Sequence, residues 1–292
     1  MAERNAKLIL MVGVLGVSAS AILVRFSQAP SGVTAAYRLG WTVLLLLPVV
    51  LLRCRAELRR VTARDLVLCG AGGVLLALHF LTWFESLKRT SVASSTVLVS
   101  TEVIFTALGF ALFLHGKIPR LGVWAILLAF GGSALLALSG GGGAGGLSGN
   151  LLALAAASAA AVYTLIGRVQ RGHLSTTVYT FLTYLACFLT LLLGTAAAGT
   201  PLTGYGGREW LIGLALAVLC TLLGHSLFSW CLKYLSPSYV SAAKLCEPVF
   251  SSLAAIPLFG EVPGPLQLAG GAAVLGAVLL YTWAEREKTP AG

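Results

Sequence analysis

The chain is built of apolar runs, each about as long as the helix that a lipid bilayer requires. A helix that crosses a hydrocarbon layer of about 30 Å needs roughly 20 predominantly apolar residues. Only 10% of the 292 residues are charged, and the runs are continuous rather than alternating, which favours helices over a barrel. We therefore predict an all-α membrane protein with ten transmembrane helices, over residues 7–24, 33–52, 65–87, 90–113, 120–138, 149–168, 176–198, 209–233, 237–259 and 264–284.

Basic residues are unevenly distributed between the segments that connect these spans. Lys and Arg number 20 against 10 Asp and Glu, an excess that nucleic-acid-binding proteins also show. With the N-terminus inside, fourteen of them fall in cytoplasmic segments, four in external segments and two, Arg38 and Lys244, within spans. This is the positive-inside pattern, so we predict cytoplasmic termini and no nucleic-acid partner. The first run is expected to be a span rather than a signal peptide, because it is long for one.

A glycine-rich segment divides the spans into five and five. Residues 139–149, SGGGGAGGLSG, contain seven glycines in eleven positions and are predicted to be a flexible external linker, since such a sequence forms no stable helix. The predicted units are a first repeat over 1–138, a second repeat over 150–285 and a cytoplasmic tail over 286–292.

The two halves resemble each other in sequence. Residues 86–117 can be laid on residues 231–261 at a constant offset of 145, which places Glu102 on Glu247. Because five is odd, the second half enters the membrane from the opposite side, so the halves form an inverted repeat. Many secondary transporters have this organisation, with the substrate site near the bilayer midplane between the repeats.

Three segments in order resemble the EamA family of the drug/metabolite transporter superfamily. They are TAAYRLGWTVLLLLP (34–48), SLKRTSVASSTVLVSTEVIFTALGFALFLHGK (86–117) and TLLGHSLFSWCLKYLSPSYVSAAKLCEPVFSSLAAIPLFGE (221–261). The resemblance covers essentially the whole chain. It implies a multi-pass transporter of a bacterial plasma membrane, monomeric or homodimeric, that moves amino acids, amines or related metabolites by alternating access. Export is expected, with uptake or solute exchange as the alternative.

Two acidic residues and a lysine lie near the middle of predicted spans, where a charge costs roughly 2.5 to 3.5 kcal/mol. Lys244 and Glu247 are three positions apart on one helical face, so they can either pair with each other or contact substrate or a coupling ion. Pro248 is expected to kink this helix. Glu102 has no basic neighbour in sequence, so it either carries protons or contacts Arg38 or a hydroxyl group.

Other polar residues within the spans are weaker candidates for substrate binding or coupling. Arg38 is expected to anchor its helix by snorkelling to the membrane surface. Pairs four residues apart share a helical face, and each can act in binding or proton relay or only in a bond between helices. These pairs are His79 with Trp83 and His225 with Ser229, and the Tyr163 hydroxyl is a further candidate for the cavity.

Competing classes of function lack their signatures in this sequence. An intramembrane enzyme needs clustered catalytic groups, whereas the four histidines lie far apart, at 79, 115, 173 and 225. The six cysteines have no metal-ligand spacing and are interpreted as packing residues, and we expect no metal or cofactor. Runs of small residues, among them AGG at 71–73, FGGSA at 130–134 and AGGAA at 269–273, predict close helix contacts.

Overall fold

The computed structural model describes residues 2–113, 120–138, 145–235, 237, 240, 243–244 and 246–286, and within this part of the chain all regular structure is helical. Seven helical segments, 22 to 27 residues long, are apolar enough to cross a membrane. Three shorter apolar helices, Arg120–Ser133, Glu247–Phe259 and Pro265–Tyr281, lie where the fifth, ninth and tenth spans are predicted. The all-α fold is thus confirmed for these residues, and the count of ten crossings stays a prediction.

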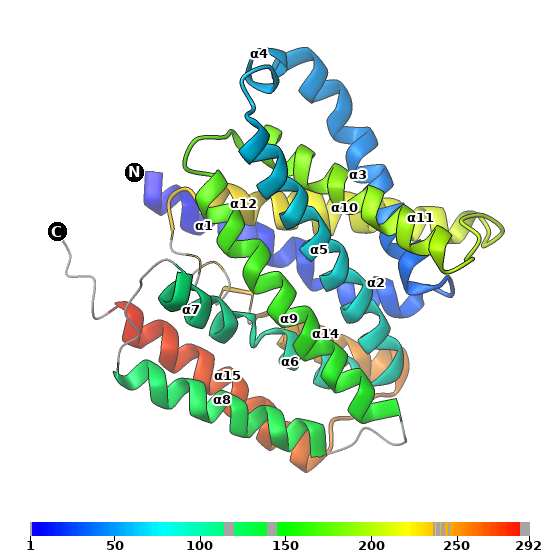
Figure 1. Ribbon diagram of the computed structural model, residues 1–292. Helices are drawn as coiled ribbons and strands as arrows, with labels where there is room; N and C mark the ends of the chain where they lie inside the picture. The colour runs from blue at the N-terminus through cyan, green and yellow to red at the C-terminus, as the bar shows by residue number, and fades with distance from the viewer. Residues whose placement is uncertain are drawn as a thin grey trace.

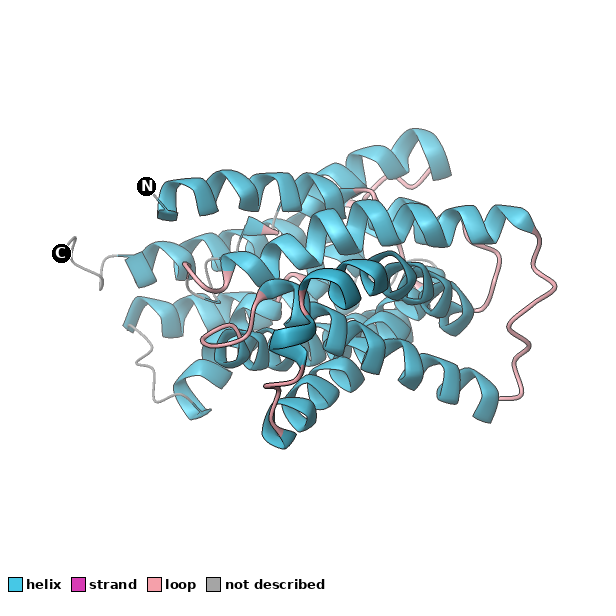
Figure 2. Cartoon of the chain, turned by 90° about the horizontal axis from the view of Figure 1, so that it is seen from above, coloured by secondary structure: helices cyan, strands magenta, loops and turns pink. Residues whose placement is uncertain are grey.

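The helices form one bundle in which elements from both halves of the sequence are interleaved (Figure 1). α5 packs against α9 and α10, α1 packs against η1, and α8 pairs with α15 along one edge. The start of α1 and the end of α15 lie on the same side of the bundle (Figures 1 and 2). The bounds are α1 (Ala2–Ser18), α2 (Ser20–Phe26), α3 (Ser31–Arg53), α4 (Arg55–Leu58), α5 (Ala63–Arg89), α6 (Val92–Val99), α7 (Glu102–Phe113), α8 (Arg120–Leu138), α9 (Gly145–Gln170), α10 (Thr176–Ala197), α11 (Gly207–Ala215), the π-helix η1 (Leu216–His225), α12 (Ser226–Cys231), α14 (Cys246–Phe259) and α15 (Pro265–Arg286).

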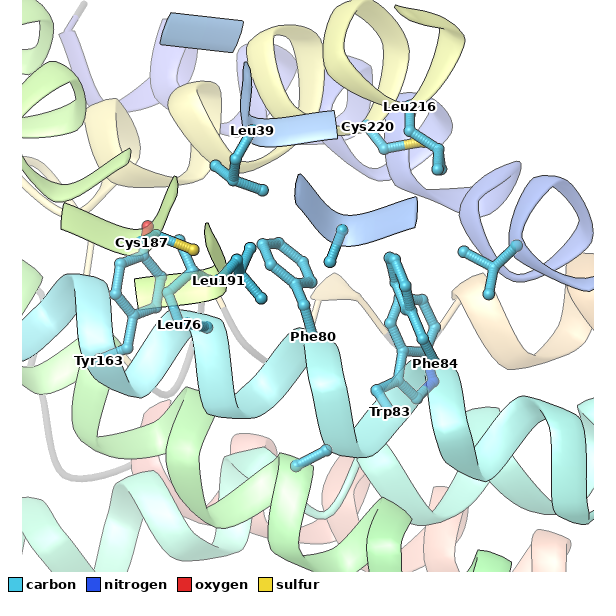
Figure 3. Close-up of a cluster of buried hydrophobic side chains, with 14 of the residues drawn as sticks. Leu39, Leu76, Phe80, Trp83, Phe84, Tyr163, Cys187, Leu191, Leu216 and Cys220 are labelled. Atoms are coloured by element: carbon cyan, nitrogen blue, oxygen red, sulfur yellow. The ribbon is translucent and has the colours of Figure 1, made fainter. Parts of the chain in front are cut away.

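Apolar side chains cover the outside of the bundle as well as fill its core. Leu52 is 82% exposed and Trp124 68% exposed, which a water-soluble protein avoids over large areas. The core gathers around α5, whose Phe80 and Phe84 are fully buried together with Leu191 of α10 (Figure 3). Helices that are apolar both on the face toward the core and on the outward face are typical of proteins surrounded by lipid rather than by water.

Glycines set the closest contacts between helices, as the small-residue runs predict. A Cβ built on Gly132 of α8 would lie 2.9 Å from the carbonyl oxygen of Gly270 on α15, and one on Gly73 of α5 would lie 2.6 Å from that of Thr183 on α10. Both distances are shorter than packed atoms tolerate. These helices can therefore approach only because no side chain separates their backbones.

The fourth predicted span is broken into two helices. α6 ends at Val99 and α7 begins at Glu102, so the span predicted over 90–113 is present as the apolar segment Val92–Phe113 but is interrupted at Ser100 and Thr101. At the break, the Ser100 hydroxyl donates to the carbonyl of Thr96 at 2.9 Å and the Thr101 hydroxyl donates to that of Leu98 at 2.7 Å. Such local bonds compete with the backbone ladder and favour an interruption.

The ninth predicted span is also interrupted near its acidic residue. Lys244 lies in a turn, and α14 begins at Cys246 with Glu247 and Pro248 in its first turn. The prediction that Pro248 kinks the interior of a helix is therefore wrong. Pro248 lies in the first turn, where a backbone N–H has no partner within the helix and its absence costs no hydrogen bond. Each glutamate thus lies at the start of a helix, whose positive end favours a nearby anion.

Part of the predicted linker is helical. Residues 139–144 lie outside the described part, but 145–149 form the first turn of α9, contrary to the prediction for this sequence. A Cβ on Gly149 would lie 2.9 Å from Cβ of Thr90, and the Thr90 hydroxyl donates to Oδ1 of Asn150 at 2.9 Å. Close packing against the end of α5 stabilises a helical start that the glycines would not form alone.

Candidate functional site

A cavity lies in the middle of the bundle between helices of both halves. The space not occupied by protein atoms amounts to about 600 Å³, a volume that includes the opening of the cavity to solvent. Its walls come from α1, α2, α5, α9, η1, α12 and α14, from the turn at Lys244 and from the break between α6 and α7. Seven of the nine candidate residues line it: His79, Trp83, Glu102, Tyr163, His225, Lys244 and Glu247.

Glu102 and Lys244 form an ion pair across the cavity. The ammonium nitrogen of Lys244 lies 2.8 and 3.0 Å from the two carboxylate oxygens of Glu102, whose Oε1 also accepts from the Thr164 hydroxyl at 2.9 Å. The partner of Glu102 therefore comes from the other half of the chain. Of the two structural contacts that the sequence suggested, the hydroxyl is present and Arg38 is not the partner. The buried carboxylate is not isolated, which removes the reason to expect that Glu102 exchanges protons unaided.

Glu247 has a different environment from Glu102. It is 8% exposed and lines the cavity, and among the described residues its Oε1 has no hydrogen-bond partner. The suggested pairing with Lys244 is wrong, because Lys244 lies in a turn before α14 and directs its ammonium group to Glu102. Both carboxylates nevertheless lie inside the bundle rather than toward lipid.

Arg38 is fully buried rather than extended to the membrane surface, so the snorkelling interpretation is wrong. Its Nε donates to the Thr221 hydroxyl at 2.7 Å and its Nη1 to the Ser20 hydroxyl at 3.3 Å. The guanidinium carbon lies 4.2 Å from the centre of the Phe80 ring. Thr221 belongs to the π-helix η1, a widened turn that often marks a functional region. Arg38 thus supports the wall of the cavity without lining it.

The two membrane histidines, which are far apart in sequence, meet at the cavity. The ring centres of His79 and His225 lie 6.3 Å apart, and the His79 ring stacks on Trp83 at 5.8 Å. Nδ1 of His79 is 3.0 Å from the Ala156 carbonyl, to which it donates in the tautomer that carries a proton there. Within the described ranges no group of three His, Cys, Asp or Glu residues is placed to hold a metal ion.

Tyr163, Ser229 and Trp83 complete the set of candidates. The Tyr163 hydroxyl is 3.3 Å from the Ser229 hydroxyl. Tyr163 lines the cavity, whereas Ser229 is buried and does not line it. Trp83 lines the cavity as well, and its indole N–H has no hydrogen-bond partner among the residues described.

Corresponding positions of the two halves face the same cavity. The offset of 145 that relates Glu102 to Glu247 also relates Trp83 to Phe228 and Val99 to Lys244, and all six residues line the cavity. Phe228 was missed in the sequence, although the offset from Trp83 could have identified it. Thr164 was missed as well, and no sequence signal indicates it.

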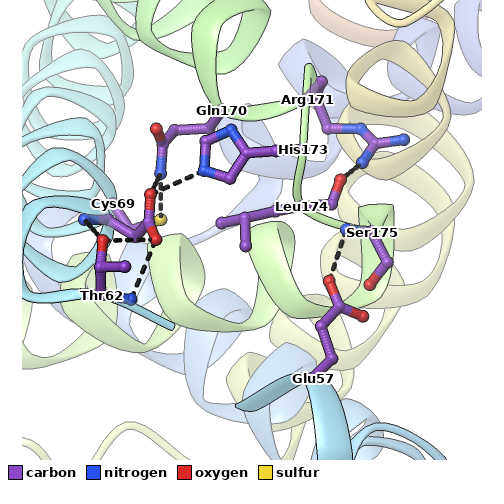
Figure 4. A network of polar contacts seen from close by, with 9 residues as sticks. Glu57, Thr62, Cys69, Gln170, Arg171, His173, Leu174 and Ser175 are labelled. Atoms are coloured by element: carbon purple, nitrogen blue, oxygen red, sulfur yellow. Dashed lines mark hydrogen bonds and ion pairs between the residues drawn. The ribbon is translucent and has the colours of Figure 1, made fainter. Parts of the chain in front are cut away.

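Polar contacts join the halves on either side of the cavity. At one end, Gln170 and His173, both labelled in Figure 4, contact Asp65: the Gln170 amide donates to its carboxylate at 3.2 Å, and Nε2 of His173 lies 2.7 Å from the same oxygen. At the other end, Arg25 contacts Glu261 at 2.8 Å, and the rings of Phe26 and Phe259 lie 5.1 Å apart. These contacts connect α2 and α5 of the first half to elements of the second.

The sequence and the fold both match known proteins. The sequence model described as the EamA-like transporter family matches residues 5–138 and again residues 147–283. The pseudopaline exporter CntI of Pseudomonas aeruginosa strain UCBPP-PA14 is 24% identical over 207 residues, which make up 71% of this chain and 72% of that protein, and CntI of strain PAO1 matches to the same extent. A crystal structure with 21% sequence identity superposes with a TM-score of 0.67 over 98% of this chain and 99% of the other, which shows a common fold.

Proposed function

The chain belongs to the EamA-like transporter family, and from this premise we propose that it exports a small polar or amphipathic metabolite, such as an amino acid or amine, by alternating access. The observation that carries the proposal is the cavity between the halves, with two carboxyl groups, of Glu102 and Glu247, and the ammonium group of Lys244 on its wall. Charged groups at this depth are rare and mark substrate or ion pathways. Export, rather than uptake or exchange, is supported by the similarity to a protein named as an exporter.

The same proposal includes an arrangement in the membrane. Ten crossings in two inverted repeats, over 1–138 and 150–285, with the connection at 139–149 and the tail at 286–292, would place both termini in the cytoplasm of a bacterial cell. Two observations support it. The family sequence model matches the chain twice, with bounds close to these, and the first and last described helices have their chain ends on one side of the bundle. The interruptions beside Glu102 and Glu247 also resemble the discontinuous helices that form substrate sites in transporters.

Proton coupling is the second part of the proposal. We propose that Glu247 carries the coupling proton, because it is buried, lines the cavity and lacks the lysine contact that holds Glu102. Neutralisation of a buried carboxylate by a proton is the least costly way to leave it unpaired in lipid. An ionised Glu247 would instead need a positive charge from the cargo or the solvent.

Transport by the purified full chain in liposomes tests the proposal. We expect saturable counterflow of at least one amino acid or amine. We also expect an imposed pH gradient to drive net flux of this substrate through the wild-type protein but not through Glu247→Gln. Glu85→Gln is the matched control, since Glu85 pairs with Arg89 near the end of α5, outside the cavity. Non-saturable flux would indicate a channel, and pH-driven flux that is unchanged in Glu247→Gln would refute the coupling.

A further inference from the structure

We propose that the cavity binds a positively charged nitrogen of its substrate, an ammonium or guanidinium group, between the carboxylate of Glu247 and the aromatic face of Trp83. The chain would then select cationic or zwitterionic amines over metabolites that carry only negative charge. This inference rests on the transport function proposed above and names the substrate class of the same site.

The first argument is the charge balance of the cavity wall. Lys244 and Glu102 neutralise each other at 2.8 Å. Arg38, the nearby buried cation, donates to Thr221 and Ser20; it attracts Glu247 electrostatically but forms no ion pair with it in the described part of the chain. An ionised Glu247 therefore has no cation in contact with its carboxylate, and buried charges are strongly disfavoured unless they are paired. A substrate that brings a positive charge supplies the missing partner.

The second argument comes from the chain's own ammonium group. Nζ of Lys244 contacts the carboxylate of Glu102 and lies 5.3 Å from the centre of the Phe228 ring, a distance typical of cation–π attraction. In this wall, a carboxylate and an aromatic face together hold one positively charged nitrogen. The structure thus contains an intramolecular example of the proposed binding mode.

The third argument is the sequence relationship between the halves. The offset of 145 relates Glu102 to Glu247, Trp83 to Phe228 and Val99 to Lys244. The second carboxylate and the second aromatic ring are both present at the cavity, but valine replaces the lysine. By this correspondence, the place of the lysine ammonium falls to a position between Glu247 and Trp83, to which Val99 brings no charge. We assign this position to the substrate nitrogen.

Binding of three ligands that share one aromatic body tests the assignment. Phenethylamine is a cation, phenylalanine a zwitterion and 3-phenylpropionate an anion. For the full chain in lipid nanodiscs, we expect calorimetric affinity for phenethylamine to exceed that for 3-phenylpropionate at least tenfold. Glu247→Gln should lower phenethylamine affinity at least tenfold, whereas Glu85→Gln should not change it. Equal affinities for cation and anion, or unchanged phenethylamine affinity in Glu247→Gln, would overturn the inference.

Val99→Lys provides a second test with Glu247 in place. The new ammonium group should occupy the proposed position and abolish phenethylamine binding, while Val99→Met, of similar length but uncharged, should retain it. Equal binding to both variants would contradict the assignment. Counterflow separates this inference from the proposed function: failure of transport itself removes all saturable counterflow, whereas failure of the inference leaves saturable counterflow that does not depend on the charge of the ligand.

Discussion

Lys244 and Glu102 are 142 positions apart in the chain, and the ammonium nitrogen of one lies 2.8 and 3.0 Å from the two carboxylate oxygens of the other. One residue comes from each half, so this ion pair crosses the interface at which the halves would move during alternating access. It also distinguishes two sequence-related glutamates: Glu102 is paired, whereas Oε1 of Glu247 has no hydrogen-bond partner within the described part of the chain. The difference between the halves, rather than their similarity, gives the cavity its charge pattern.

The strength of this pair can be measured with a double-mutant cycle. Glu102→Gln or Lys244→Met alone leaves one buried charge without its partner, which should lower the free energy of unfolding by about 3 kcal/mol. The double variant removes both charges and should lose much less than the sum of the single changes. Unfolding of purified protein in mixed detergent micelles provides the measurement. Additive losses would show that the two side chains do not interact.

Arg38 should not be replaceable by lysine. The planar guanidinium of Arg38 donates to Thr221 while its face covers the Phe80 ring, and lysine has no planar group that could do both. Arg38→Lys is therefore expected to lower the free energy of unfolding by about 1 to 3 kcal/mol, the typical cost of a buried polar group that loses its hydrogen-bond partner. Arg208→Lys is the control, because the bond that the described residues show for Arg208 is an exposed one, to the Phe26 carbonyl. If both variants unfold at the same denaturant concentration as the wild type, the buried network around Arg38 contributes no stability.

Two adjacent glycines of α8 should respond differently to alanine. The Cβ of Gly132→Ala would lie 2.9 Å from the Gly270 carbonyl oxygen, whereas no atom of the described residues lies within 4 Å of a Cβ on Gly131. Overpacking typically costs about 1 to 3 kcal/mol, while alanine in an open helical position gains up to about 1 kcal/mol. The midpoint temperature of thermal unfolding should therefore fall for Gly132→Ala and stay equal or rise for Gly131→Ala. A reversed order would show that α8 and α15 are not in close contact.

The contact between Phe26 and Phe259 is expected to open during transport. Their rings lie 5.1 Å apart beside the Arg25–Glu261 ion pair, and one residue belongs to each half. In the double variant Phe26→Cys/Phe259→Cys, a bifunctional methanethiosulfonate that spans the gap between the two thiols should stop counterflow, and reduction should restore it. Each single variant controls for an effect of the reagent on native cysteines. Full transport by protein shown to be cross-linked would mean that this side of the bundle stays closed.

Much of the fold follows from sequence because hydrophobic length and small-residue runs act locally. The AGG and FGGSA runs indicated close contacts, and Gly73 and Gly132 make them. The interruptions at Ser100 and Lys244 were not predicted, because hydroxyl-to-carbonyl bonds and the packing of the turn compete with a helix that the apolar pattern alone favours. The helical start at Gly145 was missed for the opposite reason, since packing against Thr90 outweighs the low helix propensity of glycine.

The sequence by itself determined that ionisable residues would lie in lipid-spanning helices and that the two halves would correspond, because both conclusions depend on residue type and spacing along the chain. Only the tertiary structure decided that Lys244 pairs with Glu102, that Arg38 turns inward to Thr221 and that His79 meets His225. Pairing between distant helices depends on how the bundle packs, and several partners are equally compatible with one spacing. A buried charge is strongly disfavoured unless it is paired, and the packing of the bundle determines which residue is its partner.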